Sequence, residues 1–543
     1  IVFVVEHRSD GCDCFVGALT REQYYSKEQA RQTHAPVAHS HCSPPMPFAF
    51  KPDSPWATPL PHQTECAATL NDPMMCDQSG IVTLPCGSGK TRIALEQALQ
   101  CKKVLFLSYE LTGVEQFKHA LLTHTNVDPR HVLTLTGSSK ANPSKSICFL
   151  STSYGILTSM ETKSEKTQSI VKSVLTSIPW DLIVCDEVHH SPANAYQHVL
   201  KTLMHNQPSS GKVIGITATL VRKASTTDDP HTVFDFIGPV LFEKSWKQME
   251  EAKVVSKLDF VGVSTSMDAM FALAHEQTSG LTQSYIATLP PNKMIAIWNI
   301  TRLHLLRGHV GIVFCDHIYP AEQVVAMLGE GWFLMRGFIY EHSCTDGGSS
   351  SSTSATNVLT SVEDRMKLKD RINAGDPLVK GIVATQVADA ALDIHHADFC
   401  YGVSVDASSS EATNAQRAGR IMRNNANAPT QKHAYFYDLI TTGTSDVAAS
   451  QERRRFMVDE GYNYTDTDPE FFEETIAKAK VADVDKVYMC LATPCPFSES
   501  HSDHRTHRLA LLVEALRVAA RAGGVREGKK QALEHKKQHK LAK

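Results

Sequence analysis

The sequence has no apolar run that approaches the roughly 20 residues needed to cross a bilayer, and no secretory leader is evident at its start. We therefore expect neither a membrane protein nor a secreted one. A surplus of basic residues is also missing, since 54 Lys and Arg stand against 58 Asp and Glu, for a formal net charge of −4. Because basicity across a whole domain is the usual mark of nucleic-acid binders, any nucleic-acid contact is expected in a local channel.

A regular cysteine pattern is absent too. The 14 cysteines are scattered, and the potential metal ligands near the N-terminus fit no standard zinc-finger spacing: Cys12, Cys14, His39, His41 and Cys42. Other cysteines fall on apolar segments that we interpret as buried strands, namely Cys185, Cys315 and Cys400. We therefore expect reduced thiols, as in intracellular proteins. With 543 residues, 42% of them apolar, the chain can bury two or more cores.

The segment LPCGSGKT, residues 84–91, has the composition of a phosphate-binding loop. An apolar run at 81–84 predicts a buried strand before it, and a helical stretch at 91–99 follows, which is the context that such a loop requires. Leu84 stands where the general pattern has glycine, so the match is one residue short. The alternative, a Gly-rich turn without a ligand, fits this context less well.

The residue types of this loop suit a nucleoside triphosphate. Backbone N–H groups around Gly87, Ser88 and Gly89 can bind phosphate oxygens at the positive end of a helix dipole. Lys90 would reach the β- and γ-phosphates, and the Thr91 hydroxyl would ligate Mg²⁺. The sequence thus predicts ATP and Mg²⁺ as the bound species.

A second motif, DEVHH, begins at Asp186 directly after the apolar run 181–185. It is therefore expected at the carboxyl end of a strand, where open α/β sheets bind their ligands. Asp186 would hold Mg²⁺, and Glu187 would orient and deprotonate the attacking water. His189 would link the nucleotide state to the other motifs.

The segment QRAGRIMR, residues 416–423, predicts a helix on which Gln416, Arg420 and Arg423 share roughly one face. Arginine side chains there can approach a γ-phosphate and stabilise the charge of the transition state. A solvated basic helix face is the alternative. The phosphate loop upstream favours the catalytic interpretation, since together the motifs describe a nucleic-acid motor driven by ATP.

Apolar strands alternate with helical stretches in two regions of the chain, and this alternation predicts a parallel sheet with right-handed crossovers in each. The fold class we expect is α/β, with two tandem RecA-like domains around a cleft. The predicted strands lie at 81–84, 104–107, 147–150, 182–185 and 213–216 in the first region and at 310–314, 381–384, 399–403 and 434–437 in the second.

Five segments follow from this pattern. They are an N-terminal extension (1–55), the first RecA-like domain (56–250), a thumb-like insertion or linker (251–290), the second RecA-like domain (291–464) and a C-terminal extension (465–543). In the last of these, Leu509, Leu512 and Leu516 belong to an apolar stripe that predicts a helix docked on a partner or on the chain's own core. A run rich in lysine follows, which we interpret as a solvated tail.

The order and wording of these motifs resemble the XPB family of superfamily 2 helicases, whose members are the ATPase subunits of the transcription and repair factor TFIIH. The resemblance covers about residues 60–464. The segments with close family counterparts are VEQFK (114–118), DEVHHSPA (186–193), TATLVR (217–222), FIGPVLFEKSW (236–246) and RRRFMVDEGYNY (453–464). The last two are not generic helicase features, so they separate this family from the RNA helicases.

The resemblance implies a 3′–5′ DNA helicase or translocase that acts in the nucleus, in nucleotide excision repair, transcription initiation or both. The implied partners are DNA and TFIIH-like or repair subunits, without a membrane. Gln63, in LPHQ, resembles the adenine-reading glutamine of the family. Asp389 lies in the segment Val387-Ala388-Asp389, where the family tends to have Val-Gly-Asp, and is implied to bind the nucleotide as well. The implied coupling residues are His189, Thr217, Thr219 and Gln416.

Candidate contacts to the DNA backbone mostly follow predicted strands on the same edge as the phosphate loop. Hydroxyl, amide and backbone N–H groups suit phosphate positioning without readout of sequence. The candidates are Ser108, Lys118, Ser153, Arg222, Thr385 and Gln386.

One departure from the family concerns strand separation. Arg222 is followed by Lys223, Ala224 and Ser225, whereas the family usually continues with Glu-Asp and so completes an Arg-Glu-Asp element. A duplex DNA translocase that does not separate strands therefore stays open as an alternative. A second alternative is a TFIIH-like scaffold subunit without enzyme activity, although the intact site residues argue against it. A diverged paralogue of the TFIIH subunit would fit the same departure.

Overall fold

A computed structural model gives the protein's structure for residues 2–7, 13–19, 48–109, 111–135, 147–159, 175, 178–188, 194–205, 207–208, 211–218, 237–336, 358–359, 361–385, 394–396, 398–405, 411–423, 431–472, 495–497, 503 and 505–518. Statements below refer to these residues. They form two units, 1–47 and 48–543. In the first unit, strands β1 (Val2–His7) and β2 (Asp13–Leu19) pair as an antiparallel hairpin.

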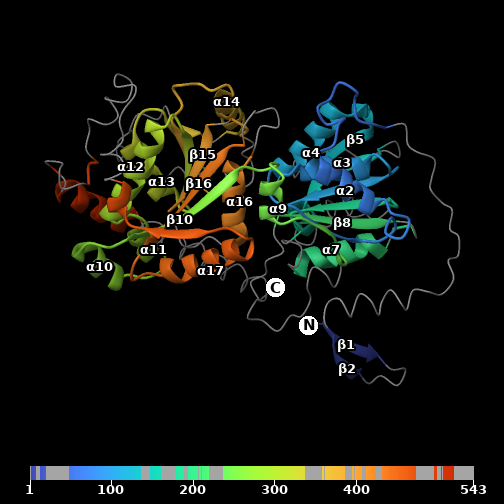
Figure 1. Ribbon diagram of the computed structural model, residues 1–543, viewed down its shortest axis with the longest axis horizontal. Coiled ribbons are helices and arrows are strands. Elements are labelled where there is room, and N and C mark those ends of the chain that lie inside the picture. Colours follow the sequence, from blue (N-terminus) through green and yellow to red (C-terminus); the bar gives the residue numbers. More distant parts are fainter. Residues whose placement is uncertain are drawn as a thin grey trace, which may run out of the picture. The chain divides into compact units, whose positions relative to one another are not determined.

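The second unit contains two parallel sheets (Figure 1). The first sheet has seven strands in the order β5-β6-β4-β7-β8-β3-β9. Its strands are β3 (Gly80–Thr83), β4 (Val104–Ser108), β5 (Val132–Leu135), β6 (Phe149–Ser153), β7 (Leu182–Asp186), β8 (Lys212–Thr217) and β9 (Val240–Glu243). The helices of this region are α2 (Pro61–Leu70), α3 (Lys90–Ala98), α4 (Leu111–His124), α5 (Tyr154–Ser159) and α7 (Asn194–His205), with a short 3₁₀ helix at Pro129–His131.

Alternate residues of each central strand face two separate cores. Val82 packs with α2, α3 and α4 in one cluster, whereas its neighbour Ile81 packs with α7 in another. Both side chains are fully buried. Strands that are buried on both faces read as continuous apolar runs, which is why the sequence predicts them without a polar alternation.

The second sheet has eight strands in the order β13-β12-β14-β11-β15-β16-β10-β17. Its strands are β10 (Lys257–Thr265), β11 (Val310–Phe314), β12 (Trp332–Met335), β13 (Val358–Leu359), β14 (Gly381–Ala384), β15 (Phe399–Ser404), β16 (His433–Thr441) and β17 (Tyr464–Thr467). Its helices are α9 (Trp246–Glu251), α10 (Ala269–Glu276), α11 (Gly280–Thr288), α12 (Pro291–Leu306), α13 (Ile318–Leu328), α14 (Val362–Asn373), α16 (Glu411–Ile421) and α17 (Asp446–Asp459). The α/β class with two RecA-like sheets is thus confirmed.

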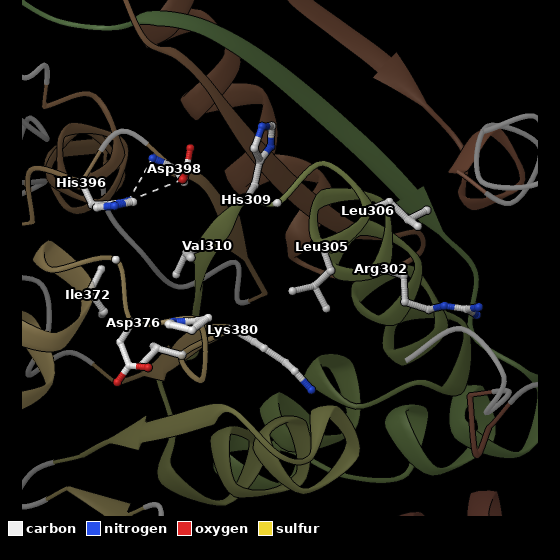
Figure 2. Close-up of a pocket in the computed structure, with 14 residues that line it drawn as sticks. Arg302, Leu305, Leu306, His309, Val310, Ile372, Asp376, Lys380, His396 and Asp398 are labelled. Carbon is white, nitrogen blue, oxygen red and sulfur yellow. Dashed lines mark hydrogen bonds and ion pairs between the residues drawn. The ribbon is translucent and has the colours of Figure 1, made fainter. Parts of the chain in front are cut away.

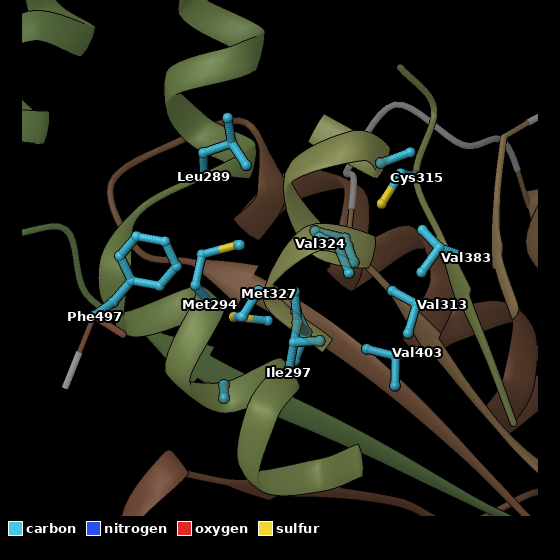
Figure 3. Packing of buried hydrophobic residues seen from close by; sticks show 14 of the residues in the cluster. Leu289, Met294, Ile297, Val313, Cys315, Val324, Met327, Val383, Val403 and Phe497 are labelled. Atoms are coloured by element: carbon cyan, nitrogen blue, oxygen red, sulfur yellow. The ribbon is translucent and has the colours of Figure 1, made fainter. Parts of the chain in front are cut away.

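Helices cover both faces of this sheet as well. On one face, Met294 and Ile297 of α12 and Val324 of α13 pack against Val313 and Val403 of the strands (Figure 3). On the other face, the core includes residues of α9, α14, α16 and α17. Helix α16, which contains the arginine motif, therefore packs against this face of the sheet.

The range 251–290, which the sequence assigns to a thumb-like insertion, contains a strand of the second sheet. Strand β10 pairs in parallel with β16 over nine residues and with β17 on its other side. Helices α10 and α11 follow it and contribute Phe271 and Ile286 to the core. If the domain boundary is defined by strand pairing, the second domain begins before β10.

The C-terminal helix at 505–518 docks on the second domain's own core. Its Leu511, Leu512 and Ala515 are at most 5% exposed, and Leu516 packs against the same cluster. Leu509, which the predicted stripe includes, is 52% exposed. The buried face of this helix is therefore rotated by part of a turn from the apolar face that the sequence predicts.

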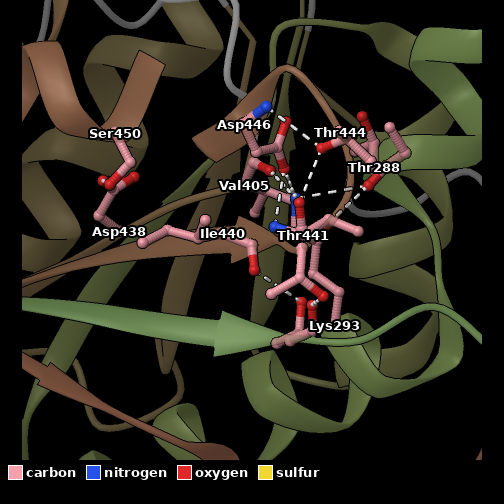
Figure 4. Close-up of polar contacts among 12 residues, drawn as sticks. Thr288, Lys293, Val405, Asp438, Ile440, Thr441, Thr444, Asp446 and Ser450 are labelled. Carbon is pink, nitrogen blue, oxygen red and sulfur yellow. Dashed lines mark hydrogen bonds and ion pairs between the residues drawn. The ribbon is translucent and has the colours of Figure 1, made fainter. Parts of the chain in front are cut away.

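A buried ion pair ties several elements of the second domain together. Lys293 Nζ, at the start of α12, donates to Asp446 Oδ2 and to the carbonyl oxygen of Val405, each at 2.7 Å (Figure 4). The same Asp446 oxygen accepts from the backbone N–H of Thr441 at 3.1 Å. These bonds fix the end of β15, where the chain leaves for α16.

Candidate active site

The phosphate loop has the backbone that its sequence predicts. Gly87 and Gly89 have φ angles of 85° and 82°, in the left-handed region where a side chain is disfavoured. Helix α3 begins at Lys90 directly after the loop, so the loop's N–H groups lie at a helix N-terminus. Lys90 Nζ donates to the carbonyl oxygen of Leu84 at 3.3 Å and lies 3.8 Å from Cys86 Sγ.

Two side chains of α2 hold the loop from behind. His62 Nε2 lies 2.7 Å from the carbonyl oxygen of Ser88, and Gln63 Nε2 donates to the same oxygen at 3.2 Å. Gln63 Oε1 accepts from the N–H of Leu60 at 2.9 Å. A Cβ atom on Gly89 would lie 2.3 Å from Gln63 Nε2 and would displace this amide, and the φ of 82° at this position also favours glycine. The amide of Gln63 is thus bound to the loop itself, and its role towards adenine stays a prediction.

Asp186 and Glu187 follow β7 at the same edge of the sheet. Burial and, after it, the neighbouring charge of Glu187 raise the pKa of Asp186 to about 7, although Lys90 acts to lower it. The Ser108 hydroxyl donates to Asp186 Oδ2 at 3.4 Å. Glu187 has a φ of 49°, an uncommon backbone for a residue with a side chain. The charges of Lys90 and Glu187 therefore both act on the carboxyl group of Asp186.

Thr217 lies beside the loop as well. It ends β8 opposite Thr83 of β3, and its carbonyl oxygen accepts from the N–H of Leu84 at 3.0 Å. Its side chain is fully buried. A residue in this position can sense movements of the loop through the backbone.

Helix α16 brings the arginine motif to the phosphate loop. A Cβ atom on Gly419 would lie 2.2 Å from Cys86 Cβ, and one on Gly87 would lie 3.2 Å from Arg423 Cγ. Burial lowers the pKa of the Arg423 guanidinium. Arg420 lies on the same helix, one residue after Gly419. The predicted halves of the ATP site are thus adjacent.

Arg417 has a different environment from the other arginines of the motif. It is fully buried, and its Nη2 lies 2.5 Å from Asp316 Oδ1. Its guanidinium also lies over the ring of Phe314, 5.1 Å from the centroid. This pair anchors α16 to the end of β11. Sequence reasoning missed Asp316, which follows a strand as Asp186 does, and it missed Cys86, whose place inside the loop was the available signal.

Of the predicted DNA contacts, three have buried side chains. Ser108, Ser153 and Thr385 are at most 5% exposed, so only their backbone groups could reach a phosphate in this arrangement. Lys118 is more open and lies 3.7 Å from Glu115. His189, Thr219, Arg222, Gln386 and Asp389 lie outside the described residues. These assignments therefore stay predictions.

The donor set fits a nucleotide with its Mg²⁺. No group of three or more His, Cys, Asp or Glu side chains in the described part of the chain could hold a metal by itself. Asp186 and the Thr91 hydroxyl offer two oxygen ligands, and Mg²⁺ commonly takes its remaining ligands from phosphates and water. A divalent cation beside Asp186 would also relieve the repulsion that raises the pKa of this carboxyl group.

A cavity of about 380 Å³ lies elsewhere in the second domain. It is lined by residues such as Leu305, His309, Val310, Lys380 and His396 (Figure 2). Val310 and Lys380 stand at the beginnings of β11 and β14, whereas ligands of parallel sheets bind at the carboxyl ends. We therefore do not assign this cavity to the nucleotide.

In the part of the chain that the structure describes, no helix is long and apolar enough to cross a membrane.

A phosphate loop on one RecA-like sheet and an arginine helix on the next define the class of helicase-type ATPases. A model of the ERCC3/RAD25/XPB C-terminal helicase matches residues 354–488, and one of the type III restriction enzyme res subunit matches 57–222. These matches, with the relatives below, confirm the resemblance to the XPB family that the motifs carry.

Curated relatives bear the name "General transcription and DNA repair factor IIH helicase/translocase subunit XPB". The one from Dictyostelium discoideum is 29% identical over 391 residues, covering 71% of this chain and 44% of the relative. The one from Saccharomyces cerevisiae, named XPB/SSL2, is 26% identical over 388 residues, covering 71% and 42%. The chain thus spans less than half the length of these relatives.

Among solved structures, the ATP-dependent Type ISP restriction-modification enzyme LlaBIII bound to DNA has a similar fold. The TM-score is 0.50 at 15% identity, covering 77% of this chain and 32% of that one. At this identity the similarity concerns the fold alone.

Proposed function

We propose that the protein is an ATP-dependent DNA helicase or translocase of the XPB type, moving 3′ to 5′. The observation that carries the proposal is the contact of the phosphate loop with α16, where Gly419 and Arg423 pack on Cys86 and Gly87. This contact brings a nucleotide-binding half and an arginine-bearing half to one place. The polarity comes from the family alone.

In the proposed site, the loop N–H groups and Lys90 bind the phosphates of ATP. Mg²⁺, held by Thr91 and Asp186, would neutralise charge on the phosphate oxygens. Glu187 orients the attacking water and accepts its proton. Arg420 and Arg423 donate to the γ-phosphate from the second domain, where a guanidinium stabilises the charge that develops during transfer.

Hydrolysis is coupled to movement because ATP binds to both domains at once. With ATP present, Lys90 on one side and Arg420 with Arg423 on the other favour the closed state, and loss of the γ-phosphate removes this link. Thr217, which bonds the loop through its carbonyl oxygen, is a candidate to transmit the change, together with His189, Thr219 and Gln416. Each cycle would advance the DNA backbone past Lys118, Arg222 and the other predicted contacts.

The names of the relatives support a role in DNA repair, transcription or both, inside a TFIIH-like assembly. A role in transcription initiation and a place in the nucleus come from the family resemblance alone. Those names refer to proteins more than twice as long as the matched region in two cases. A protein with the matched region alone would keep the motor. Co-purification from cells is the direct measurement of complex membership.

The test of the proposed function is steady-state ATP hydrolysis without nucleic acid, with single-stranded DNA, with duplex DNA and with RNA. We expect stimulation by DNA. We also expect Glu187→Gln to lower kcat by about 100-fold or more, since a positioned general base contributes about 10²–10⁴-fold. An undetectable rate under every condition would contradict the proposal and favour the scaffold.

A second candidate is a duplex translocase that does not separate strands. The observation that favours it is Lys223-Ala224-Ser225 after Arg222, where the family usually has Glu-Asp. Displacement of a third strand from a triplex, without unwinding of a forked duplex, would distinguish it from a helicase.

A further inference from the structure

In the described part of the chain, the strands change from the first sheet to the second once, between β9 and β10, and the first sheet holds the chain up to Lys244. Strands β3 to β9 belong to one sheet and β10 to β17 to the other. The N–H of Lys244 donates to the carbonyl oxygen of Thr83 at 3.1 Å. Its Nζ lies 2.7 Å from Glu65 Oε1 of α2. Lys244 is thus fixed to the half that carries the phosphate loop.

The next two residues belong to the second domain. Ser245 caps α9, where its Oγ accepts from the N–H of Gln248 at 3.2 Å. The N–H of Trp246 donates to Glu460 Oε2 at 3.2 Å, and its side chain is 2% exposed in the core around α16 and α17. The change of domain therefore takes place within the peptide that joins residues 244 and 245, without a linker.

The residues after α9 are hydrogen-bonded to the end of the arginine motif. The N–H of Ser256 donates to the carbonyl oxygen of Met422 at 2.7 Å, and Val255 forms a β-bridge with Arg423. Gln431 Nε2 donates to the carbonyl oxygens of Glu250 and Val255, each at 2.8 Å. A rotation of this segment relative to Lys244 would therefore move Arg423 with it.

The indole of Trp246 lies where the two halves touch. A Cβ atom on Gly419 would lie 3.4 Å from Trp246 Cη2 as well as 2.2 Å from Cys86 Cβ. Cys86, although part of the phosphate loop, packs against the cluster that contains Trp246. Among the described residues, the indole Nε1 has no hydrogen-bond partner, so shape and not a polar bond holds the ring in place.

We propose that the Lys244–Trp246 segment is the hinge of domain closure and that Trp246 is a positioning residue, whose ring sets the approach of α16 to the phosphate loop. This proposal rests on the proposed function, since closure matters for the rate only if ATP is hydrolysed between the two halves. Trp246 acts through α16 and contacts no nucleotide in this account.

The experiment compares three variants of the full chain. Trp246→Leu removes the ring, and Trp246→Phe keeps an aromatic side chain. Trp332→Leu removes an equally buried tryptophan at the start of β12, which lies between β13 and β14 in the second sheet. For each we would measure kcat and KM for ATP with duplex DNA, the affinity for ADP by calorimetry, the melting temperature, and the change in tryptophan fluorescence on addition of a non-hydrolysable ATP analogue.

We expect Trp246→Leu to lower kcat by about 10- to 100-fold, because misplacing a catalytic group by about 1 Å can cost about 100-fold. Its affinity for ADP should stay unchanged, since the phosphate loop and its supports remain. Trp246→Phe should recover most of the rate, and Trp332→Leu should keep it. Equal losses in both Leu variants, or a wild-type kcat in Trp246→Leu, would overturn the proposal.

Failure of the proposed function can be told apart from failure of the hinge. If the unmodified chain hydrolyses no ATP, the proposed function is wrong, and the fluorescence change then decides the hinge. A change present in the unmodified chain and in Trp332→Leu but absent in Trp246→Phe supports it. The same change in Trp246→Phe, or no change in the unmodified chain, overturns it.

Discussion

At the scale of single residues, the ionised form of Asp186 is disfavoured in the folded protein, and the neighbouring groups compensate for this only in part. Burial and the charge of Glu187 raise its pKa to about 7, while Lys90 and the Ser108 hydroxyl act in the opposite direction. A carboxyl group whose pKa is raised by folding destabilises the folded state when it is ionised. Such a group is suited to receive a cation.

This leads to a prediction for Asp186→Asn. The folded-state pKa of Asp186 lies above its ordinary value of 3.8, so the destabilisation is absent below about pH 4 and complete above about pH 7. Without Mg²⁺, the variant should melt above the unmodified protein near pH 8, by about 2–4 °C for each kcal/mol relieved. The difference should shrink towards about pH 5.

Melting curves at both pH values, with and without Mg²⁺, check this prediction. Added Mg²⁺ should stabilise the unmodified protein more than the variant. A variant that melts below the unmodified protein near pH 8, or a difference in melting temperature that does not depend on pH, would show that the ionised carboxylate does not destabilise the fold.

At the scale of elements, α16 is the helix on which the two halves of the site depend. Its Arg417 is buried against Asp316, and its Gly419 lies against Cys86. The ion pair fixes the helix to its own sheet, and the glycine lets the phosphate loop come close. The helix thus combines an anchor on one side with a bare surface on the other.

The prediction at this scale concerns Gly419→Ala. Replacing glycine by alanine inside a helix normally stabilises it by about 1 kcal/mol, yet here the new Cβ atom would lie 2.2 Å from Cys86 Cβ. The helix should therefore persist while its approach to the loop is blocked. We expect a melting temperature that is not lowered, a similar KM for ATP, and a kcat reduced by about tenfold or more.

Gly155→Ala in α5 is the matched control, because the nearest atom to its new Cβ would be Ser153 Oγ at 4.0 Å. ATPase assays and melting curves of both variants are needed. If Gly419→Ala hydrolysed ATP at the unmodified rate, the close contact would have no part in catalysis.

The elements that the sequence predicts well are those whose signal is local. The run 81–84 corresponds to β3 (Gly80–Thr83) and the run 182–185 to β7 (Leu182–Asp186), because each strand is apolar on both faces. Strand β10 was missed, since its place is fixed by pairing with β16 (His433–Thr441), far along the chain. Local patterns carry no information on such a partner.

The same distinction holds for the candidate site. Lys90, Asp186, Glu187, Arg420 and Arg423 could be singled out because their motifs combine residue type with a strand end or a helix face. The contacts Arg417–Asp316 and Gly419–Cys86 could not, because each joins residues from distant parts of the sequence. The sequence also could not show that Ser108 donates to Asp186.

At the scale of the whole molecule, the C-terminal helix completes the larger core of the second domain. Leu511, Leu512 and Ala515 join Phe497 and residues of α12 and α13 in one cluster. The matched family models end before this helix, at residue 488. The segment nonetheless belongs to the fold of the second domain.

Truncation should show this contribution. Removing residues 473–543 would expose several apolar side chains, each worth about 1.5–3 kcal/mol for a fully buried Leu or Phe. We expect a clear drop in melting temperature or loss of folding. Removing 519–543 alone, which keeps the helix, should leave stability close to that of the full chain. Equal melting temperatures of the two truncated proteins would contradict the docking of the helix.

The crossing between residues 244 and 245 divides more than the fold. On one side of it lie the phosphate loop, Asp186 and Glu187, and on the other lie the arginines proposed to act on the last phosphate of ATP. The two halves also match different family models, 57–222 and 354–488. A gene divided at this point would encode two parts, each with its own complete sheet and neither with a complete catalytic centre. Recombination there could exchange one half of the motor between relatives and leave both cores intact.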